Sequence, residues 1–380
     1  MTAPSIPKTW DIFCRVVDNF GDAGVCWRLA RILHREHGLN VRLWIDDPAT
    51  LRALYPDLDA AVPLQQADGI TVCRWRDAAP LPGDTAVVIE AFGCGLPESY
   101  VAAMAAGKRP PLWIVLEYLS AESWVDVHHG LSSPHPRLPL PRYFFFPGFT
   151  SATGGLLREA DLQSRRAVFD AAVFRRDMGF TDTTENALTV SLFAYADAPV
   201  AELLAAMAQD VVPAVVAVPG SALLPAVRTF FGVAADDRGP WRRGALEVRA
   251  LPFLPQARYD ELLWACDLNF VRGEDSFVRA QWAARPLVWQ PYRQEDGAHQ
   301  RKLQAFLTRY DKDLGPAAAA ALGEFWRCWN GDPAGLKVAW PRLRAVQGDL
   351  RRHAGRWAGD LAAHGDMAGQ LVGFVANRVK

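Results

Sequence analysis

The chain has few cysteines and no compact group of them. None of the six forms a CxxC pair or a closely spaced series, which excludes zinc-ribbon folds and small disulfide-stapled folds. The six positions are Cys14, Cys26, Cys73, Cys94, Cys266 and Cys328. Scattered thiols fit a reducing compartment, so we expect a cytoplasmic protein.

The chain also lacks an excess of charge of one sign and lacks long apolar runs. Its 41 Lys and Arg against 42 Asp and Glu give a net charge of −1, whereas nucleic-acid binders show a clear basic excess. No run approaches the roughly 18 apolar residues that a membrane span needs. The opening MTAPSIPKTW has no apolar signal core. We therefore expect no nucleic-acid partner, no membrane partner and no export.

Motifs for common cofactors are missing as well. The sequence contains neither a GxGxxG dinucleotide fingerprint nor a phosphate-binding loop of the GxxxxGK[ST] type. The neighbouring His128, His129 and His135 lie in a Pro- and Ser-rich segment without a second ligand pattern, which favours structural or solvent-facing roles. We expect no metal and no resident cofactor.

What is present in the first half is a series of short apolar runs separated by helical patterns. The run WDIFCRVV (10–17) predicts a strand, and the spacing of Val25, Leu29, Ile32 and Leu33 predicts a helix after it. Four further runs predict strands at 41–45, 85–92, 111–119 and 142–149. Strands alternating with helices indicate a parallel, Rossmann-like α/β sheet.

A second series of the same kind follows a charged segment at 156–183. Its strands are predicted at 188–195, 211–220, 246–254, 268–271 and 286–292, with helices at 198–208, 257–265 and 276–284. We predict one Rossmann-like domain at 1–178, completed by a C-terminal helix at about 362–380, and a second at 184–361. Two such domains facing each other across a cleft suit a two-substrate enzyme, but kinases, binding proteins, epimerases and glycosyltransferases share this plan.

Two carboxylates mark the turn after the first predicted strand. Asp18 and Asp22 flank Phe20 and Gly21, where parallel sheets carry their ligand sites. A helix N-terminus keeps a nearby carboxylate ionised, as a general base or a cation clamp requires. The alternative is a helix cap, which needs only one aspartate.

The second half carries a polar turn between the strand at 268–271 and the following helix. There, backbone N–H groups and Ser276 could cradle phosphates, Gly273 would permit close approach, and Arg272 could neutralise charge. Glu274 and Asp275 repel phosphate and are better explained by hydrogen bonds to sugar hydroxyls. The alternative is a capping cluster at the start of the helix.

Aromatic residues lie at or beyond the ends of other second-half strands. Phe193, Tyr195 and Phe253 could stack a nucleobase, and Gln256 could read its edge. Each of them, taken singly, is more typical of the hydrophobic core than of a ligand contact. The residues alone thus lead to a two-domain, nucleotide-dependent transferase and no further.

Four stretches closely resemble the EarP family, the bacterial arginine rhamnosyltransferases that modify translation elongation factor P. They are CRVVDNFGDAGVCWRLAR (14–31), LEYLSAESWVDVHHGLSSPHP (116–136), PGFTSATGGLLRE (147–159) and FVRGEDSFVRAQWAARPLVWQPY (270–292). The similarity extends over essentially the whole chain, and the motifs DNFGDxG and RGEDSFVRAQWA are not general features of α/β enzymes.

The resemblance implies a GT-B glycosyltransferase that moves L-rhamnose from dTDP-β-L-rhamnose, with inversion and without metal, to an arginine nitrogen of elongation factor P. The N-terminal domain would take the acceptor and the C-terminal domain the donor. Asp18 matches an essential aspartate, Asp22 the expected general base, and Glu274 an essential glutamate. The other matching positions surround the thymidine diphosphate in the family: Phe193, Tyr195, Phe253, Gln256, Arg272, Gly273, Asp275 and Ser276. A sugar-nucleotide epimerase or hydrolase, or a non-catalytic binding module, remains the alternative.

Overall fold

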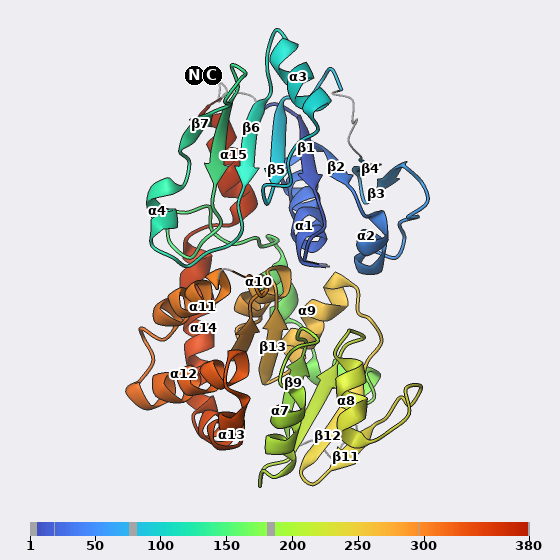
Figure 1. Cartoon of the computed structure of the whole chain (residues 1–380), viewed down its shortest axis with the longest axis vertical. Helices are drawn as coiled ribbons and strands as arrows, with labels where there is room; N and C mark the ends of the chain where they lie inside the picture. Colours follow the sequence, from blue (N-terminus) through green and yellow to red (C-terminus); the bar gives the residue numbers. More distant parts are fainter. Residues whose placement is uncertain (1–5, 19, 76–81, 181–186, 296, 379–380) are drawn as a thin grey trace. The chain divides into compact units, whose positions relative to one another are not determined.

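The chain folds into two compact units. The computed structural model describes residues 6–18, 20–75, 82–180, 187–295 and 297–378. Unit 1 comprises Met1–Ala160 and Leu361–Lys380, and unit 2 comprises Asp161–Asp360 (Figure 1). Each unit is a mixed α/β fold around one sheet in which most strands run parallel.

The division of the chain differs from the predicted domain bounds, because unit 2 begins after Ala160 rather than after residue 178. The reason is apolar burial. Helix α6 (Ala171–Asp177) buries Phe174 in a core cluster with Leu262 and Val215, both of unit 2. Residues 161–178, which we assigned to the first domain, therefore belong to the second unit.

Unit 1 contains an eight-stranded sheet in the order β3-β4-β2-β1-β5-β6-β8-β7. Its strands are β1 (Thr9–Cys14), β2 (Asn40–Ile45), β3 (Leu64–Ala67), β4 (Ile70–Arg74), β5 (Val87–Ala91), β6 (Leu112–Leu116), β7 (Ser132–Pro134) and β8 (Pro141–Phe145). The edge strands β3 and β7 are antiparallel and the six between them are parallel. Counted along the chain, the parallel strands lie in the Rossmann order 3-2-1-4-5-6.

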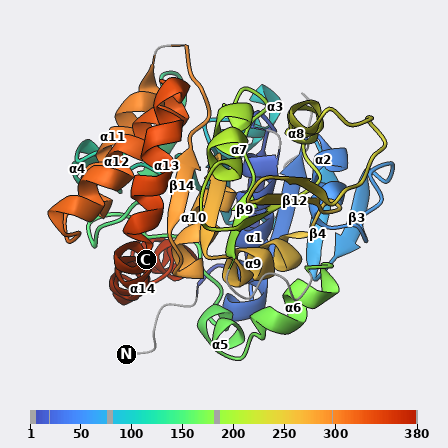
Figure 2. The same ribbon diagram turned by 90° about the horizontal axis from the view of Figure 1, so that it is seen from below.

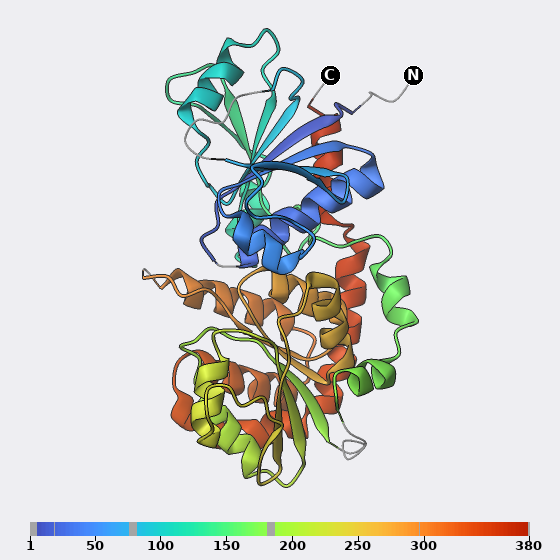
Figure 3. The same ribbon diagram turned by 90° about the vertical axis from the view of Figure 1, so that its right-hand side faces the viewer.

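The predicted strands of this half are confirmed in β1, β2, β5, β6 and β8. The hairpin of β3 and β4 was not predicted. The helices of the unit are α1 (Phe20–His37), α2 (Pro48–Leu54), α3 (Glu98–Ala106), α4 (Trp124–His128) and α15 (Met367–Ala376). Helix α15 lies beside α1 and contacts it (Figure 3). It buries Leu371, Val372 and Val375. This burial gives the apolar C-terminal stretch the surface that its sequence requires.

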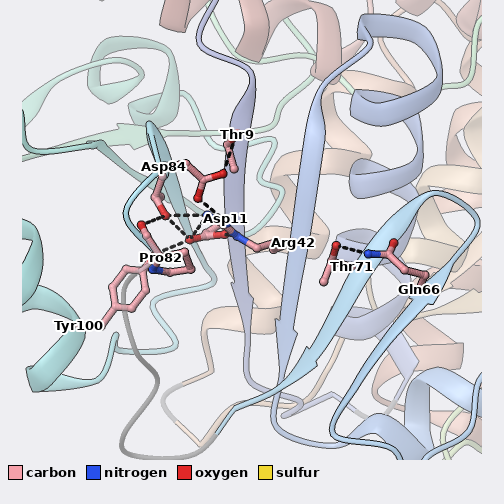
Figure 4. Close-up of polar contacts among 9 residues, drawn as sticks. Thr9, Asp11, Arg42, Gln66, Thr71, Pro82, Asp84 and Tyr100 are labelled. Carbon is pink, nitrogen blue, oxygen red and sulfur yellow. Dashed lines mark hydrogen bonds and ion pairs between the residues drawn. The ribbon is translucent and has the colours of Figure 1, made fainter.

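A buried polar network ties the strands of unit 1 together at the end remote from the turn after β1. Asp11 of β1 is fully buried and accepts hydrogen bonds from Thr85, Tyr100 and Arg42 (Figure 4). Arg42 of β2 also donates to Asp84, at 2.8 Å. A buried carboxylate of this kind is tolerated because every contact supplies a donor.

Unit 2 contains a six-stranded sheet in the order β11-β12-β10-β9-β13-β14, in which only β11 is antiparallel. Its strands are β9 (Leu188–Leu192), β10 (Ala214–Val218), β11 (Trp241–Arg243), β12 (Leu246–Ala250), β13 (Leu268–Arg272) and β14 (Leu287–Gln290). The five parallel strands follow the order 3-2-1-4-5 along the chain, so the Rossmann arrangement recurs. All five were predicted and are confirmed.

The helices of unit 2 surround this sheet. They are α5 (Leu162–Ala167), α6, α7 (Val200–Ala208), α8 (Leu224–Phe231), α9 (Gln256–Ala265), α10 (Asp275–Ala283), α11 (Ala298–Tyr310), α12 (Pro316–Asn330), the 3₁₀ helix η2 (Pro333–Gly335), α13 (Leu336–Ala345) and α14 (Gln347–Ala363). The three predicted helices are confirmed as α7, α9 and α10. Figure 2 shows α11, α12 and α13 gathered beside β14. Within the described ranges, no helix is both long and apolar enough to cross a membrane.

Candidate functional site

The site of unit 1 lies where its strand order reverses. Strands β1 and β5 are neighbours, but the chain continues from them toward opposite edges of the sheet, and ligands of open α/β sheets bind at the carboxyl ends of such strands. Asp18 and Asp22 follow β1 there. Their exposed fractions are 7% and 2%, so two acidic side chains are buried at one turn.

Asp22 is held by the backbone of its own turn. Its Oδ2 accepts hydrogen bonds from the amide N–H groups of Val17 at 2.8 Å and Asp18 at 2.9 Å. The Tyr118 side chain forms a further hydrogen bond with this carboxylate. Asp22 thus accepts hydrogen bonds from backbone amides at the start of α1, as the capping interpretation holds. A second acid, Asp18, and Tyr118 lie beside it.

Burial raises the pKa of the Asp22 carboxyl above its ordinary value. The two amides and Tyr118 act in the opposite direction, because they stabilise the ionised form, while nearby Asp46 adds to the increase. A carboxylate with a raised pKa is a stronger base than an exposed aspartate. This is the direction that general-base catalysis requires.

The turn depends on a glycine. The Gly21 N–H donates to the Asp18 carbonyl at 2.7 Å, and a Cβ at Gly21 would lie 3.0 Å from the Asp18 Oδ2. A larger residue would press on the Asp18 carboxylate. The DNFGD motif therefore has a steric reason for its glycine.

Three further residues near this turn were not predicted. Asp46 follows β2 and accepts from the Val16 N–H at 2.9 Å. Phe92 follows β5, and its ring stacks on that of Tyr118, which follows β6, with centroids 4.5 Å apart and 15° between the planes. Asp46 lies just beyond the predicted strand at 41–45, whereas Phe92 and Tyr118 lie within the last two residues of the predicted strands at 85–92 and 111–119. These positions were the signal that could have identified them, since carboxyl ends of parallel strands share one edge.

The corresponding site of unit 2 lies at the ends of β9 and β13, where that sheet reverses its order. Arg272 ends β13 and is 9% exposed. Its guanidinium carbon lies 4.6 Å from the ring centroid of Phe193 and 4.5 Å from that of Tyr195. The structure thus brings these three predicted residues together, and the two rings stack on the guanidinium by cation–π interaction.

Two groups of the predicted phosphate cradle, the Ser276 hydroxyl and the Gly273 N–H, form hydrogen bonds within the protein, which the sequence did not indicate. The Ser276 hydroxyl accepts from the Arg272 N–H at 3.1 Å and donates to the Arg272 carbonyl. Gly273 adopts the left-handed region with φ of 59°, which directs its N–H to the carbonyl of Gln290 at 3.1 Å. Both groups therefore shape the turn.

The two acids of this turn differ in their contacts. Glu274 occupies the N-cap position of α10, but its side chain makes no capping hydrogen bond. Asp275 accepts from the amide of Gln256 at 3.2 Å, which joins the starts of α9 and α10. The half-buried Phe253 follows β12 on the segment that leads to α9, where the absent side chain of Gly220 lets its backbone approach.

A cavity of about 310 Å³ opens beside Tyr195 within unit 2. Gln290 lines it and accepts from the Tyr195 N–H at 2.9 Å, while Tyr292 packs edge-on against the Tyr195 ring at 5.8 Å. Both residues follow or end β14 and were not singled out from sequence. In the part of the chain that the structure describes, no three His, Cys, Asp or Glu side chains group as metal ligands.

Comparison with known proteins decides the family. A model for "Elongation-Factor P (EF-P) rhamnosyltransferase EarP" matches residues 10–376. The chain belongs to the EarP family. It is 47% identical over 376 residues to the protein-arginine rhamnosyltransferase of Pseudomonas putida, covering 97% of this chain and 99% of that relative. The enzyme of the same name from Pseudomonas aeruginosa is 46% identical with the same coverage. The resemblance predicted from the motifs is confirmed.

Solved structures agree with this membership. An EarP structure concerned with arginine glycosylation of elongation factor EF-P is 36% identical, with a TM-score of 0.68 and coverage of 98% of this chain and 99% of that one. MurG of Acinetobacter baumannii and the rhamnosyltransferase SpnG, each 13% identical, share the fold with TM-scores of 0.51. MurG covers 98% of this chain and SpnG 96%. The predicted fold class is therefore confirmed: the chain is a glycosyltransferase with the GT-B fold.

Proposed function

We propose that this chain transfers L-rhamnose from dTDP-β-L-rhamnose, with inversion, to a side-chain nitrogen of one arginine of translation elongation factor P. Membership of the EarP family supports the reaction class. The observation that carries the assignment of roles is the contrast between two buried carboxylates at the switch point of unit 1 and a buried arginine at that of unit 2.

On the acceptor side, unit 1 has to bind and activate a guanidinium. Arginine is a poor nucleophile, because it stays protonated and its lone pairs are delocalised. Asp18 would orient it through charge-assisted hydrogen bonds, and Asp22 would accept its proton. The buried surroundings of Asp22 and its raised pKa support the second role.

On the donor side, unit 2 has to bind a nucleoside diphosphate and stabilise its departure. Arg272 carries the positive charge for the diphosphate, and the N-terminus of α10 adds partial positive charge. Glu274 and Asp275 would accept hydrogen bonds from sugar hydroxyls. Phe193, Tyr195 and the other predicted donor residues, Phe253, Gln256, Gly273 and Ser276, would shape the pocket for the nucleoside.

The proposed step is a single displacement. A guanidinium nitrogen forms a bond to the anomeric carbon of rhamnose while the bond from that carbon to the diphosphate oxygen breaks. The proton of the attacking nitrogen passes to Asp22, and dTDP leaves with the bonding electron pair. One displacement without a covalent intermediate inverts the anomeric carbon, which matches a single base on the acceptor side.

Two further expectations belong to this proposal. Stabilisation of the leaving group by Arg272 and by α10 would make a divalent cation unnecessary, so we propose a metal-independent enzyme without a resident cofactor. The cytoplasmic location stays a prediction.

Intact-mass analysis tests the reaction. We expect elongation factor P, incubated with this protein and dTDP-β-L-rhamnose, to gain one deoxyhexose on a single arginine. Donor incubated without the acceptor is the control. Free sugar or an altered sugar nucleotide in that control, with no mass added to the acceptor, would indicate a hydrolase or epimerase. Acceptor binding without any release of dTDP would indicate a binding module.

A further inference from the structure

The side chain of Tyr118, which hydrogen-bonds to the Asp22 carboxylate, belongs to an aromatic pair with Phe92. Tyr118 lies two residues beyond the end of β6 and Phe92 one residue beyond the end of β5, and both are half-buried. The Phe92 N–H donates to the Leu116 carbonyl at 2.6 Å, and the Glu117 N–H donates to the Phe145 carbonyl at 3.0 Å. The backbone on both sides of the pair is thus tied to adjacent strands.

The rings of this pair are parallel and in contact. Their centroids lie 4.5 Å apart with 15° between the planes. Phe92 adopts a φ of 57°, a left-handed conformation that bulky side chains rarely take. Gly93, which follows it, has a φ of 60°, and the Cys94 N–H closes the turn onto the Ala91 carbonyl at 3.1 Å. An unfavourable backbone state is thus maintained where it places the Phe92 ring on Tyr118, as strained residues at functional sites commonly do.

We propose that Tyr118 is a positioning residue for the base of the reaction: its side chain hydrogen-bonds to the Asp22 carboxylate, and stacking on Phe92 holds it there. This inference rests on the proposed function, in which Asp22 accepts the proton. The two backbone amides fix one carboxylate oxygen, and a hydroxyl donor on a restrained ring restricts the rotation of the group. A base that is already oriented loses less entropy when it reacts.

The charges around Asp22 determine the sign of the effect. Asp46 faces it from the end of β2, Cys14 from β1 and Asp18 from the same turn, while Cys26 of α1 hydrogen-bonds to Cys14. Among these contacts the Asp46 carboxylate raises the pKa of Asp22, whereas the hydrogen bond from Tyr118 lowers it. Loss of the Tyr118 hydroxyl should therefore raise the pKa of Asp22. When the pH is lowered, the variant should then lose activity at a higher pH than the unchanged protein does.

The test is the pH profile of Tyr118→Phe, which removes the hydroxyl and keeps the ring. We expect the acid limb of kcat/KM to move to higher pH, so that acidic activity falls roughly tenfold more than alkaline activity, the usual effect of one charge-assisted hydrogen bond. Tyr100→Phe is the matched control. It removes another tyrosine–aspartate hydrogen bond of unit 1, that to Asp11, and should leave the acid limb in place (Figure 4).

Variants of Phe92 test the stack separately. Phe92→Ala should lower kcat with little change in the KM for the donor, whereas Phe92→Tyr should retain most of the activity. A Tyr118→Phe profile that overlays the unchanged protein would overturn the inference, as would equal acid shifts in Tyr118→Phe and Tyr100→Phe.

Titration of the Asp22 carboxyl by NMR separates this inference from the proposed function, because it needs no turnover. We expect the midpoint to rise in Tyr118→Phe. An unchanged midpoint would overturn the role of Tyr118 even if rhamnose transfer is established. Full activity of Asp22→Asn would instead overturn the assignment of the base, whatever the titration shows.

Discussion

Units 1 and 2 repeat one strand order but use it for side chains of opposite charge. In both, the first parallel strand lies between the second and the fourth, and a loop with polar residues follows it or its neighbour. Unit 1 places Asp18 and Asp22 there, and unit 2 places Arg272 against two aromatic rings. The comparison indicates that the shared strand order decides where these polar residues lie, while a few side chains decide which charge is buried there.

Two buried carboxylates, one in each unit, are stabilised by different kinds of donor. In unit 1 backbone amides donate to Asp22, so the carboxylate is built into the turn itself. In unit 2 the buried carboxylate of Asp260, in α9, is instead paired with a side chain, because Arg279 of α10 donates two hydrogen bonds to it, at 2.9 and 2.7 Å. This pair aligns the two helices whose first residues form the predicted donor site.

The largest effect on the contrast between the two units should come from Asp22→Asn. An asparagine oxygen can still accept from the amides of Val17 and Asp18, so the turn should persist, but the base is lost. We expect rhamnose transfer to fall by roughly 1,000-fold. Donor binding, measured by calorimetry, should be unchanged because unit 2 is untouched. Near-normal turnover would remove Asp22 from the mechanism.

The next largest effect should come from the buried pair of unit 2. Arg279→Ala removes the bidentate partner of a carboxylate that is 1% exposed, which should lower the free energy of unfolding by about 3–5 kcal/mol. Urea unfolding measures this. Arg42→Ala is the counterpart in unit 1 and should cost less, because Asp11 keeps donors from Thr85 and Tyr100. Equal decreases in the free energy of unfolding for the two variants would contradict this difference between the two buried pairs.

Arg272 separates charge from stacking at the donor site. Arg272→Lys keeps the positive charge but loses the planar group that lies on Phe193 and Tyr195. We expect donor affinity to fall about tenfold in the lysine variant and further in Arg272→Gln. Glu274→Gln, tested beside them, should weaken donor affinity or turnover. Calorimetry and kinetics that show no change for Arg272 and Glu274 variants would refute the donor-side assignment.

The smallest expected effect is that of a chelator. If Arg272 and α10 stabilise the leaving diphosphate, EDTA should leave turnover unchanged. The measurement is the initial rate of dTDP release with and without EDTA. Loss of activity that Mg²⁺ restores would show that unit 2 needs a cation to do what we assign to its side chains.

Much of the fold was predictable because the parallel strands are short apolar runs bounded by turn residues. All five parallel strands of unit 2 and five of the six in unit 1 were predicted from this pattern. The antiparallel edges β3, β7 and β11 were not, since they are short and mostly exposed. The boundary was also misplaced, because the sequence of α6 does not reveal which core receives Phe174.

The chain by itself determined the class of fold, the family, and the positions of Asp18, Asp22 and Arg272, since these depend on local periodicity and on long motifs. Only the tertiary structure decided which groups surround them. Tyr118 reaches Asp22, and Phe92 reaches Tyr118, from distant segments because parallel strands bring their carboxyl ends to one edge. The raised pKa of Asp22 has the same origin, because burial is a property of the packed protein and not of any motif.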